Sequence, residues 1–121
     1  EQTREFNYID NLIDGFLLAA SEPKAIGEII NIGSGEDISI KDLVTKIHKL
    51  SDSKSDLKIG TLKYRPTEIW RMFADNKKAK AILDWEPKIS FQEGLSKTIQ
   101  WFKEYHDVFI DEKSSLIQLS K

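Results

Sequence analysis

Apolar residues in the first part of the chain recur every three or four positions, which is the period of an amphipathic α-helix. The pattern begins at Asp10 and ends near Ser21, and Leu12, Ile13 and Phe16 mark its apolar stripe. Either Asp10 or the asparagine that follows it is expected to cap this helix. The sequence therefore predicts a surface helix that buries one stripe of side chains.

Two serines that stand three positions before an acidic residue predict the beginnings of two more helices. Ser39, followed by Asp42, should begin a short helix, and Ser90, followed by Glu93, forms a capping box that opens a longer one. The inward side chains of the longer helix are expected to be Leu95, Ile99 and Phe102, with Trp101 as a further candidate.

Another helix is expected between these two, with Asp75 as its cap and Ala79, Ile82 and Leu83 on its apolar side. It should stop before the Trp-Glu-Pro sequence at 85–87, because proline disfavours helical backbone in the residue before it. The large ring of the tryptophan is expected to seal the turn between this helix and the next one by packing.

Short runs of alternating or β-branched residues predict strands. We expect a short strand or extended entry at residues 3–9, a strand at 28–32 and a half-buried strand at 57–62. Residues 69–73 are apolar enough for a helical turn or an irregular edge strand, which their spacing does not separate, and we expect them in the core. The apolar residues of the tail, 107–121, follow no clear period, so that it frays, docks or meets a neighbouring molecule.

Length and composition fit one small domain. A chain of 121 residues buries roughly two-thirds of its unfolded surface, which is enough for a single core. The net charge of -2 provides no basic field for nucleic acid, and no apolar run is long enough to span a bilayer. The absence of cysteine excludes disulfides, thiolate metal sites and a cysteine nucleophile. The start does not resemble a signal peptide, so a cytoplasmic location is expected, and a start at Glu1 suggests a piece of a longer protein.

The sequence Arg65-Pro66-Thr67-Glu68 is the strongest candidate for binding chemistry. Because Pro66 favours extended backbone at Arg65, this stretch is expected to present its side chains from a loop. A guanidinium pairs with two phosphate oxygens at once, and a carboxylate accepts from two neighbouring hydroxyls such as those of a ribose. The alternative is an ordinary surface turn with an exposed Arg/Glu pair, and such pairs are common.

Two other features are expected to be structural only. Gly33 and Gly35 form a Gly-x-Gly turn, but a dinucleotide-binding fingerprint needs a third glycine three positions later, where the chain has Ile38. His48 lies near the end of its helix, where a histidine is favourable to the helix dipole. No metal site is expected.

The order of several loose motifs resembles a known family. The chain contains, in order, REFNYIDNL, INIGSGE, SIKDL, YRPTE, ADNKKAK, LDWEPKIS and EGLSKTIQW. This succession, from Thr3 to Phe102, resembles the C-terminal part of NAD-dependent nucleotide-sugar epimerases and dehydratases, the extended short-chain dehydrogenase/reductases. UDP-glucose 4-epimerase-like and nucleotide-sugar 4,6-dehydratase-like enzymes are among them.

The resemblance implies an α/β substrate-binding lobe of three to four helices with a few short strands, without the Rossmann domain. In that family the arginines that match Arg4 and Arg65 approach the diphosphate of the nucleotide-sugar, and the acidic residue that matches Glu68 holds ribose hydroxyls. Many members have Gly-Asp where this chain has Thr67-Glu68, so the ribose contact and the nucleotide preference stay open. The lobe is expected to span residues 1–106, followed by the tail at 107–121.

The resemblance also implies chemistry that this chain lacks. Family catalysis uses a bound nicotinamide and a Tyr-x-x-x-Lys pair, whereas Tyr8, Tyr64 and Tyr105 have no lysine four positions later. We therefore expect no catalytic and no cofactor-binding residues here, with NAD bound by the missing N-terminal Rossmann domain of the full-length parent. An exposed surface that once faced that domain could drive self-association.

Two functions remain open at this point. The first is a non-catalytic fragment that binds a UDP- or dTDP-sugar for a parent isomerase or lyase. The second is a stand-alone binding or interaction module that kept the fold without the chemistry. The sequence does not separate epimerase from dehydratase and does not identify the base or the sugar.

Overall fold

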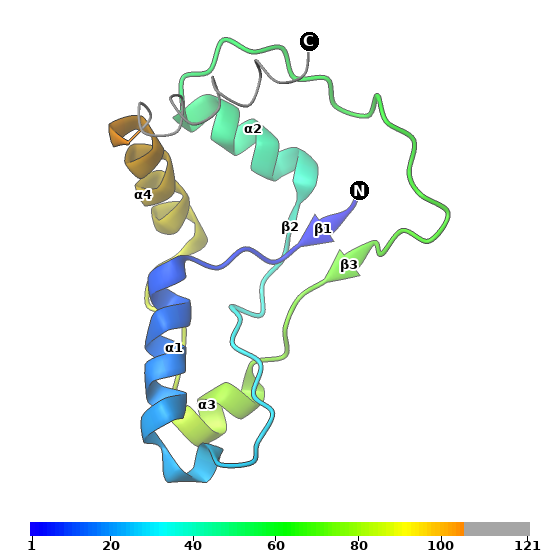
Figure 1. Ribbon diagram of the computed structural model, residues 1–121. Coiled ribbons are helices and arrows are strands. Elements are labelled where there is room, and N and C mark those ends of the chain that lie inside the picture. The colour runs from blue at the N-terminus through cyan, green and yellow to red at the C-terminus, as the bar shows by residue number, and fades with distance from the viewer. Residues whose placement is uncertain (106–121) are drawn as a thin grey trace, which may run out of the picture.

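The computed structural model describes residues 1–105 as an open arrangement of helices around a small sheet (Figure 1). In chain order its elements are β1 (Thr3–Arg4), α1 (Ile9–Ser21), the 3-10 turn η1 (Pro23–Ala25), β2 (Ile38–Ser39), α2 (Ile40–Leu50), β3 (Arg71–Met72), α3 (Lys77–Leu83) and α4 (Phe91–Glu104). The expected α/β class, with its helices and short strands, is confirmed. The tail at 107–121 lies outside the described residues.

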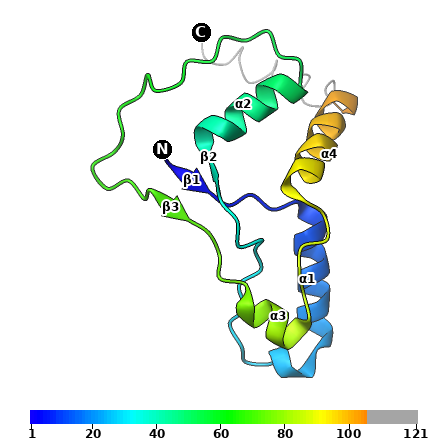
Figure 2. The same ribbon diagram turned by 180° about the vertical axis from the view of Figure 1, so that it is seen from behind.

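The three strands form one sheet in the order β2-β1-β3. Thr3 in β1 pairs with Ser39 of the antiparallel β2 and with Arg71 of the parallel β3. The N-terminal strand therefore occupies the centre of the sheet, with a neighbour on each edge. The segment between α2 and β3 runs along the outside of the molecule in both ribbon views (Figure 1 and Figure 2).

The fully buried apolar core lies between α1 and α3, at the end of the molecule opposite to α2. It consists of Ala79, Leu83 and Trp85, and we call it the Trp85 cluster. Trp85 is only 1% exposed, and its indole N–H donates to the carbonyl of Asn11 at 3.1 Å. The expectation that Trp85 seals the turn after α3 is confirmed.

Gly15 lets α1 approach this cluster closely. A Cβ at this position would lie 2.8 Å from Cγ2 of Ile32 and 3.1 Å from Nε1 of Trp85. Such a contact with Ile32 is shorter than packed carbon atoms allow, so any larger side chain would push the helix away from its neighbours. The glycine inside the helical pattern is therefore explained by packing.

Asn11 is buried, at 3% exposure, and joins α1 to the segment before α4. Its Oδ1 accepts the N–H groups of Lys88 and Ile89 at 3.0 Å, and its Nδ2 donates to the carbonyl of Ile89 at 2.8 Å. The prediction that Asp10 or Asn11 caps α1 is wrong, because Tyr8 stands at that position without a side-chain cap. The Asn11 amide instead satisfies backbone groups of a distant segment, which sequence spacing alone does not indicate.

The serine caps occur where the sequence predicts them. The hydroxyl of Ser39 accepts the N–H of Asp42 at 3.0 Å, and that of Ser90 accepts the N–H of Glu93 at 3.2 Å. These two bonds fix the first turns of α2 and α4. The cap of α3 is shifted by one position: its N-cap residue is Asn76, although the carboxylate of Asp75 still accepts the N–H of Lys77 at 3.0 Å.

Two predicted strands are absent from the described chain. Residues 28–32 and 57–62 are irregular, and Ile29 and Leu62 are 86% and 87% exposed. Both edges of β1 are already paired, so the sheet offers these segments no place beside its central strand. At 69–73 the edge-strand alternative is correct over Arg71–Met72, but the expected core position is wrong, because Trp70 is 47% exposed.

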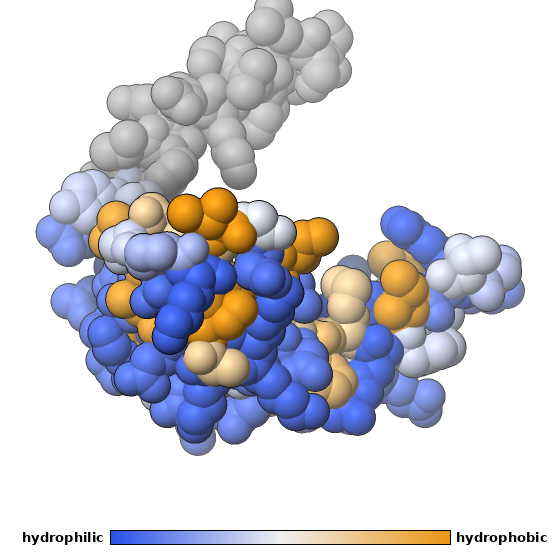
Figure 3. Space-filling model, turned by 90° about the horizontal axis from the view of Figure 1, so that it is seen from below, coloured by the Kyte–Doolittle hydropathy of each residue, from blue (hydrophilic) through white to orange (hydrophobic). Residues whose placement is uncertain are grey.

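Large apolar side chains remain accessible on the helices as well. On α1, Ile13, Phe16 and Leu17 are 47%, 62% and 65% exposed, so the predicted stripe is only partly covered. Seen from below, orange apolar patches interrupt the blue polar surface of the described residues (Figure 3). Within residues 1–105 no helix combines the length and the apolarity that crossing a membrane requires.

Candidate functional site

The structure brings two of the three predicted site residues together at β1. The guanidinium of Arg4 lies 3.3 Å from Oε1 of Glu68, and the two side chains are 21% and 14% exposed. The same carboxylate oxygen accepts from the side-chain amide of Gln2, and Arg4 also donates to the carbonyl of Thr3 at 2.6 Å. Glu68 is therefore held by two donors: Arg4 in the central strand, and Gln2 just before it.

Backbone bonds set this meeting of distant segments. The N–H of Thr3 donates to the carbonyl of Trp70 at 2.8 Å, which holds the residues before β3 against β1. The N–H of Glu68 donates to the carbonyl of Arg65 at 3.2 Å and closes a turn over the Pro-Thr pair. The loop predicted at this position is present, and it carries Glu68 back to the sheet.

Arg65 differs from the other two residues. It lies on the exposed side of the turn, and its side chain makes no hydrogen bond or ion pair with any residue in the range 1–105. Its guanidinium is thus available to an anion. The guanidinium of Arg4, in contrast, must give up its bond to Glu68 before it can bind an anion. The spacing of Arg65 and Glu68 predicts that they act together on one ligand, but in the structure Glu68 pairs with Arg4.

Two aromatic side chains flank the same turn, and the sequence analysis did not single them out. The rings of Tyr64 and Trp70 have centroids 4.6 Å apart, and the residues are 53% and 47% exposed. Their positions on either side of the Arg-Pro-Thr-Glu stretch are the sequence signal that could have identified them. They give the turn an apolar wall beside its charged groups.

A second ion pair fastens the outer strands of the sheet to each other. Both nitrogens of the Arg71 fork donate to the carboxylate of Asp37 at 3.0 Å, and the guanidinium lies 4.5 Å from the ring centre of Phe73. Hydrogen bonds from Arg71 hold the pKa of Asp37 below its ordinary value, and the carboxylate raises the pKa of Arg71. The pair thus links Arg71 of β3 to Asp37, the residue before β2, although β1 lies between these two strands in the sheet.

The glycine turn at 33–35 does not fit a dinucleotide phosphate. The N–H of Gly35, which a phosphate would need, donates to the carboxylate of Glu5 at 2.9 Å. A carboxylate at this place repels an anion, and no third glycine opens a helix behind the turn. The backbone amide of this turn is thus engaged by a protein carboxylate.

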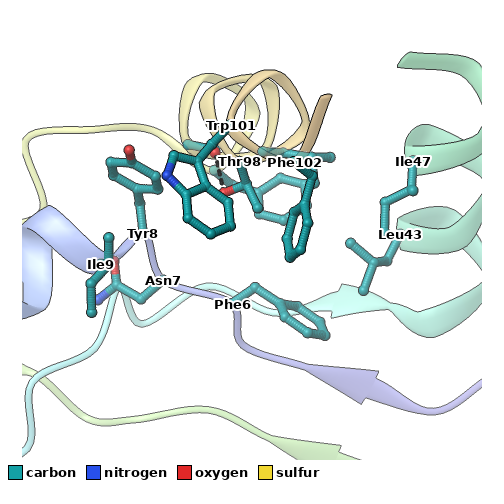
Figure 4. A pocket seen from close by; sticks show the side chains of 12 residues that line it. Phe6, Asn7, Tyr8, Ile9, Leu43, Ile47, Thr98, Trp101 and Phe102 are labelled. Atoms are coloured by element: carbon teal, nitrogen blue, oxygen red, sulfur yellow. Dashed lines mark hydrogen bonds between the residues drawn. The ribbon is translucent and has the colours of Figure 1, made fainter. Parts of the chain in front are cut away.

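A cavity of about 580 Å³ lies elsewhere, between α2 and α4. Figure 4 shows Leu43 and Ile47 of α2 opposite Trp101 and Phe102 of α4, with Phe6 between them. Phe102 was expected inward, with Trp101 as a further candidate, but the two residues are 52% and 46% exposed and line this opening. The lining is almost wholly apolar and includes none of the three predicted site residues, so it adds nothing to an anion site.

Comparison with known proteins identifies relatives for nearly the whole described chain. Residues 1–98 match the family model described as GDP-mannose 4,6 dehydratase. A UDP-glucuronate 4-epimerase from Thermodesulfobacterium geofontis is 38% identical over 104 residues, which are 85% of this chain and 31% of the relative. A UDP-N-acetyl-alpha-D-glucosaminuronate decarboxylase from Bacillus cytotoxicus is 37% identical over 108 residues, 86% of this chain and 33% of the relative.

Solved structures give the same result for the fold. The epimerase Mth375 from Methanothermobacter thermautotrophicus has a TM-score of 0.78 at 30% identity, covering 91% of this chain and 32% of that protein. A UDP-glucuronic acid 4-epimerase from Bacillus cereus, solved with NAD and UDP-4-deoxy-4-fluoro-glucuronic acid, has a TM-score of 0.72 at 36% identity, covering 85% and 32%. These matches confirm the resemblance that the motifs indicate. The chain spans about a third of the length of these relatives.

Proposed function

The chain belongs to the family described as GDP-mannose 4,6 dehydratase, and we propose that it is the part of such an enzyme that binds the nucleotide diphosphate of a nucleotide-sugar. The observation that carries this proposal is the Arg4–Glu68 pair at the central strand, with the Arg65 guanidinium, which has no ion-pair partner within residues 1–105, on the turn beside it. Two cations and one carboxylate on one surface suit a ligand that has both phosphates and hydroxyls.

Each residue has a distinct part in this proposal. Arg65 takes phosphate oxygens directly, because its planar fork matches two of them and it has no protein partner to leave among residues 1–105. Arg4 exchanges its bond with Glu68 for a phosphate oxygen as the ligand arrives. Glu68, which Gln2 still holds in place, then has an acceptor oxygen to offer to ribose hydroxyls.

The remaining chemistry belongs to the full-length parent. The proposal places NAD and the catalytic groups in a Rossmann domain outside this chain, and a UDP- or dTDP-sugar across the two parts. The relatives include epimerases, a dehydratase and decarboxylases, so the reaction at the sugar is not assigned. On this proposal the chain itself is not catalytic, and the parent works in the cytoplasm.

The alternative function is an interaction module that kept the fold. The observation in its favour is the accessible apolar face of α1, where Phe16 and Leu17 are more than half exposed. The coding region ahead of Glu1 separates the two proposals. A Rossmann glycine motif and a Tyr-x-x-x-Lys pair in frame would support the enzyme fragment, and an immediate start codon would support the module.

Titration of the chain with UDP tests the nucleotide site directly. Arg65→Ala should weaken UDP binding by about tenfold or more, since a hydrogen bond to a charged group contributes roughly 1.5–3 kcal/mol. NMR chemical-shift titration suits the weak affinity that half a cleft provides. Lys63→Ala is the matched control, because it removes a neighbouring exposed positive charge but leaves the guanidinium of Arg65 in place. Equal affinity in the Arg65 variant and the wild type would remove this residue from the site.

A further inference from the structure

The carboxylate of Glu5 collects hydrogen bonds from two segments that are far apart in the sequence. Its Oε1 accepts from the hydroxyl of Ser34 and from the N–H of Gly35, both at 2.9 Å. Its Oε2 accepts from the N–H of Ala74 at 2.6 Å. All three partners are donors, so an ionised carboxylate satisfies each of them and no other side chain of this size does.

Glu5 also ends the backbone ladder between β1 and β3. The N–H groups of Thr3 and Glu5 donate to the carbonyls of Trp70 and Met72, at 2.8 and 3.1 Å. If this parallel ladder continued, the N–H of Ala74 would donate to the backbone carbonyl of Glu5. It donates to the Glu5 carboxylate instead, so the side chain replaces the next rung.

The strands need such a fastening because each of them has only two residues. Few ladder bonds hold the register, and a slip by one residue would turn every side chain of the strand to the opposite face. Glu68 stands only two positions before Trp70, whose carbonyl receives the first rung. The register of β3 against β1 therefore decides whether Glu68 reaches Arg4.

The turn at 33–35 is fitted to this carboxylate. A Cβ on Gly33 would lie 2.6 Å from Oε1 of Glu5 and 2.6 Å from Cβ of Ala74. Only a glycine at position 33 lets the turn come close enough for the N–H of Gly35 to reach the carboxylate. The turn, the end of β3 and the central strand thus meet at one side chain.

We propose that Glu5 is a positioning residue of the nucleotide site, which acts by fixing the register of β3 on β1 and so the Arg4–Glu68 pair. This inference rests on the proposed function, since it assigns the geometry of that site to a residue that does not touch the ligand. It also assigns a role to the Gly-x-Gly turn, which serves as a ligand for a protein carboxylate.

Glu5→Gln tests the proposal with almost no change in size. An amide has one acceptor oxygen and one donor nitrogen, so it must direct an NH₂ group at the N–H of either Gly35 or Ala74. We expect UDP affinity to fall by about tenfold, which corresponds to roughly 1.4 kcal/mol. Glu5→Asp keeps both acceptors on a shorter side chain and should restore part of the affinity.

A control separates positioning from loss of stability. Asn11→Ala removes another side-chain junction of the fold, which ties α1 to the segment before α4, and within residues 1–105 no hydrogen bond links Asn11 to β3. Affinities are compared at temperatures equally far below each melting midpoint. A loss in Glu5→Gln with wild-type affinity in Asn11→Ala supports the proposal, whereas equal losses in both variants would overturn it.

Amide hydrogen exchange decides the matter independently of the ligand. The N–H of Thr3 should exchange faster in Glu5→Gln than in the wild type, because its acceptor on Trp70 belongs to the register that Glu5 fixes. Unchanged exchange at Thr3 would overturn the proposal. If the wild-type chain takes no UDP at all, the proposed function fails, and exchange at Thr3 alone then supports or overturns the role of Glu5 in the register.

Discussion

Around Trp85 the chain excludes water with apolar side chains, whereas around β1 it is joined by carboxylates, guanidinium groups and backbone amides. Ala79, Leu83 and Trp85 are nearly inaccessible, but none of the described strands contains a fully buried residue. The first region depends on apolar area removed from water, and the second on hydrogen bonds to charged groups. The apolar core and the proposed ligand site therefore lie in different parts of this small molecule.

The largest loss of folding stability is expected from Trp85→Ala, in the apolar region. Removing a buried indole costs about 3–5 kcal/mol, which is a large share of the 5–15 kcal/mol that typically holds a domain together. Urea unfolding followed by circular dichroism measures the loss. Trp70→Ala is the matched control in the β1 region, where the indole is 47% exposed and the cost should be much smaller. Similar costs at both positions would contradict the contrast.

Gly15→Ala should have an intermediate effect. Alanine favours helix over glycine by about 1 kcal/mol, but its Cβ would press on Ile32 and Trp85, and overpacking typically costs roughly 1–3 kcal/mol. We expect net destabilisation in thermal unfolding. In a double-mutant cycle with Ile32→Ala, the double variant should lose less stability than the sum of the two single-variant losses, because Ile32→Ala removes the side chain that the new Cβ would press on. Strict additivity would place the strain elsewhere.

The smallest effect is expected from Asp37→Asn, and it should appear near neutral pH and vanish in acid. Because the folded state holds the pKa of Asp37 below its ordinary value, the unfolded chain takes up the proton first as the pH falls. The contribution of the Arg71 pair is therefore present above about pH 4 and is lost below it. Asp37→Asn should flatten the acid decline of the melting midpoint, and Glu36→Gln, at the neighbouring exposed carboxylate, should not. Parallel declines in wild type and Asp37→Asn would exclude this pair as the cause.

Local signals in the sequence were sufficient for the helices. Ser39 and Ser90 are followed by acidic residues at the right distance, and both cap bonds occur. The large ring of Trp85 before a proline was also enough to predict its burial. These features depend on neighbours within a few positions, which a single sequence contains.

The failures concern partners that lie far along the chain. The amide of Asn11 was available as a cap, but it bonds to backbone groups 77 and 78 positions away. The strand expected at 57–62 has the right alternation, but within residues 1–105 it pairs with no strand of the sheet. For the candidate site, chemistry indicated Arg65 and Glu68, whereas the partner of Glu68 is set by strand register. Only pairing across 64 positions places Arg4 there.

The central position of β1 has a practical consequence for preparing the protein. Gln2 touches Glu68, and the terminal ammonium of Glu1 donates to the Tyr64 hydroxyl at 3.1 Å, so any residue attached ahead of Glu1 emerges against the turn that carries Arg65. An affinity tag placed there would add its own side chains beside the proposed nucleotide site. A purification handle is therefore better attached behind the tail, or cut away before any titration.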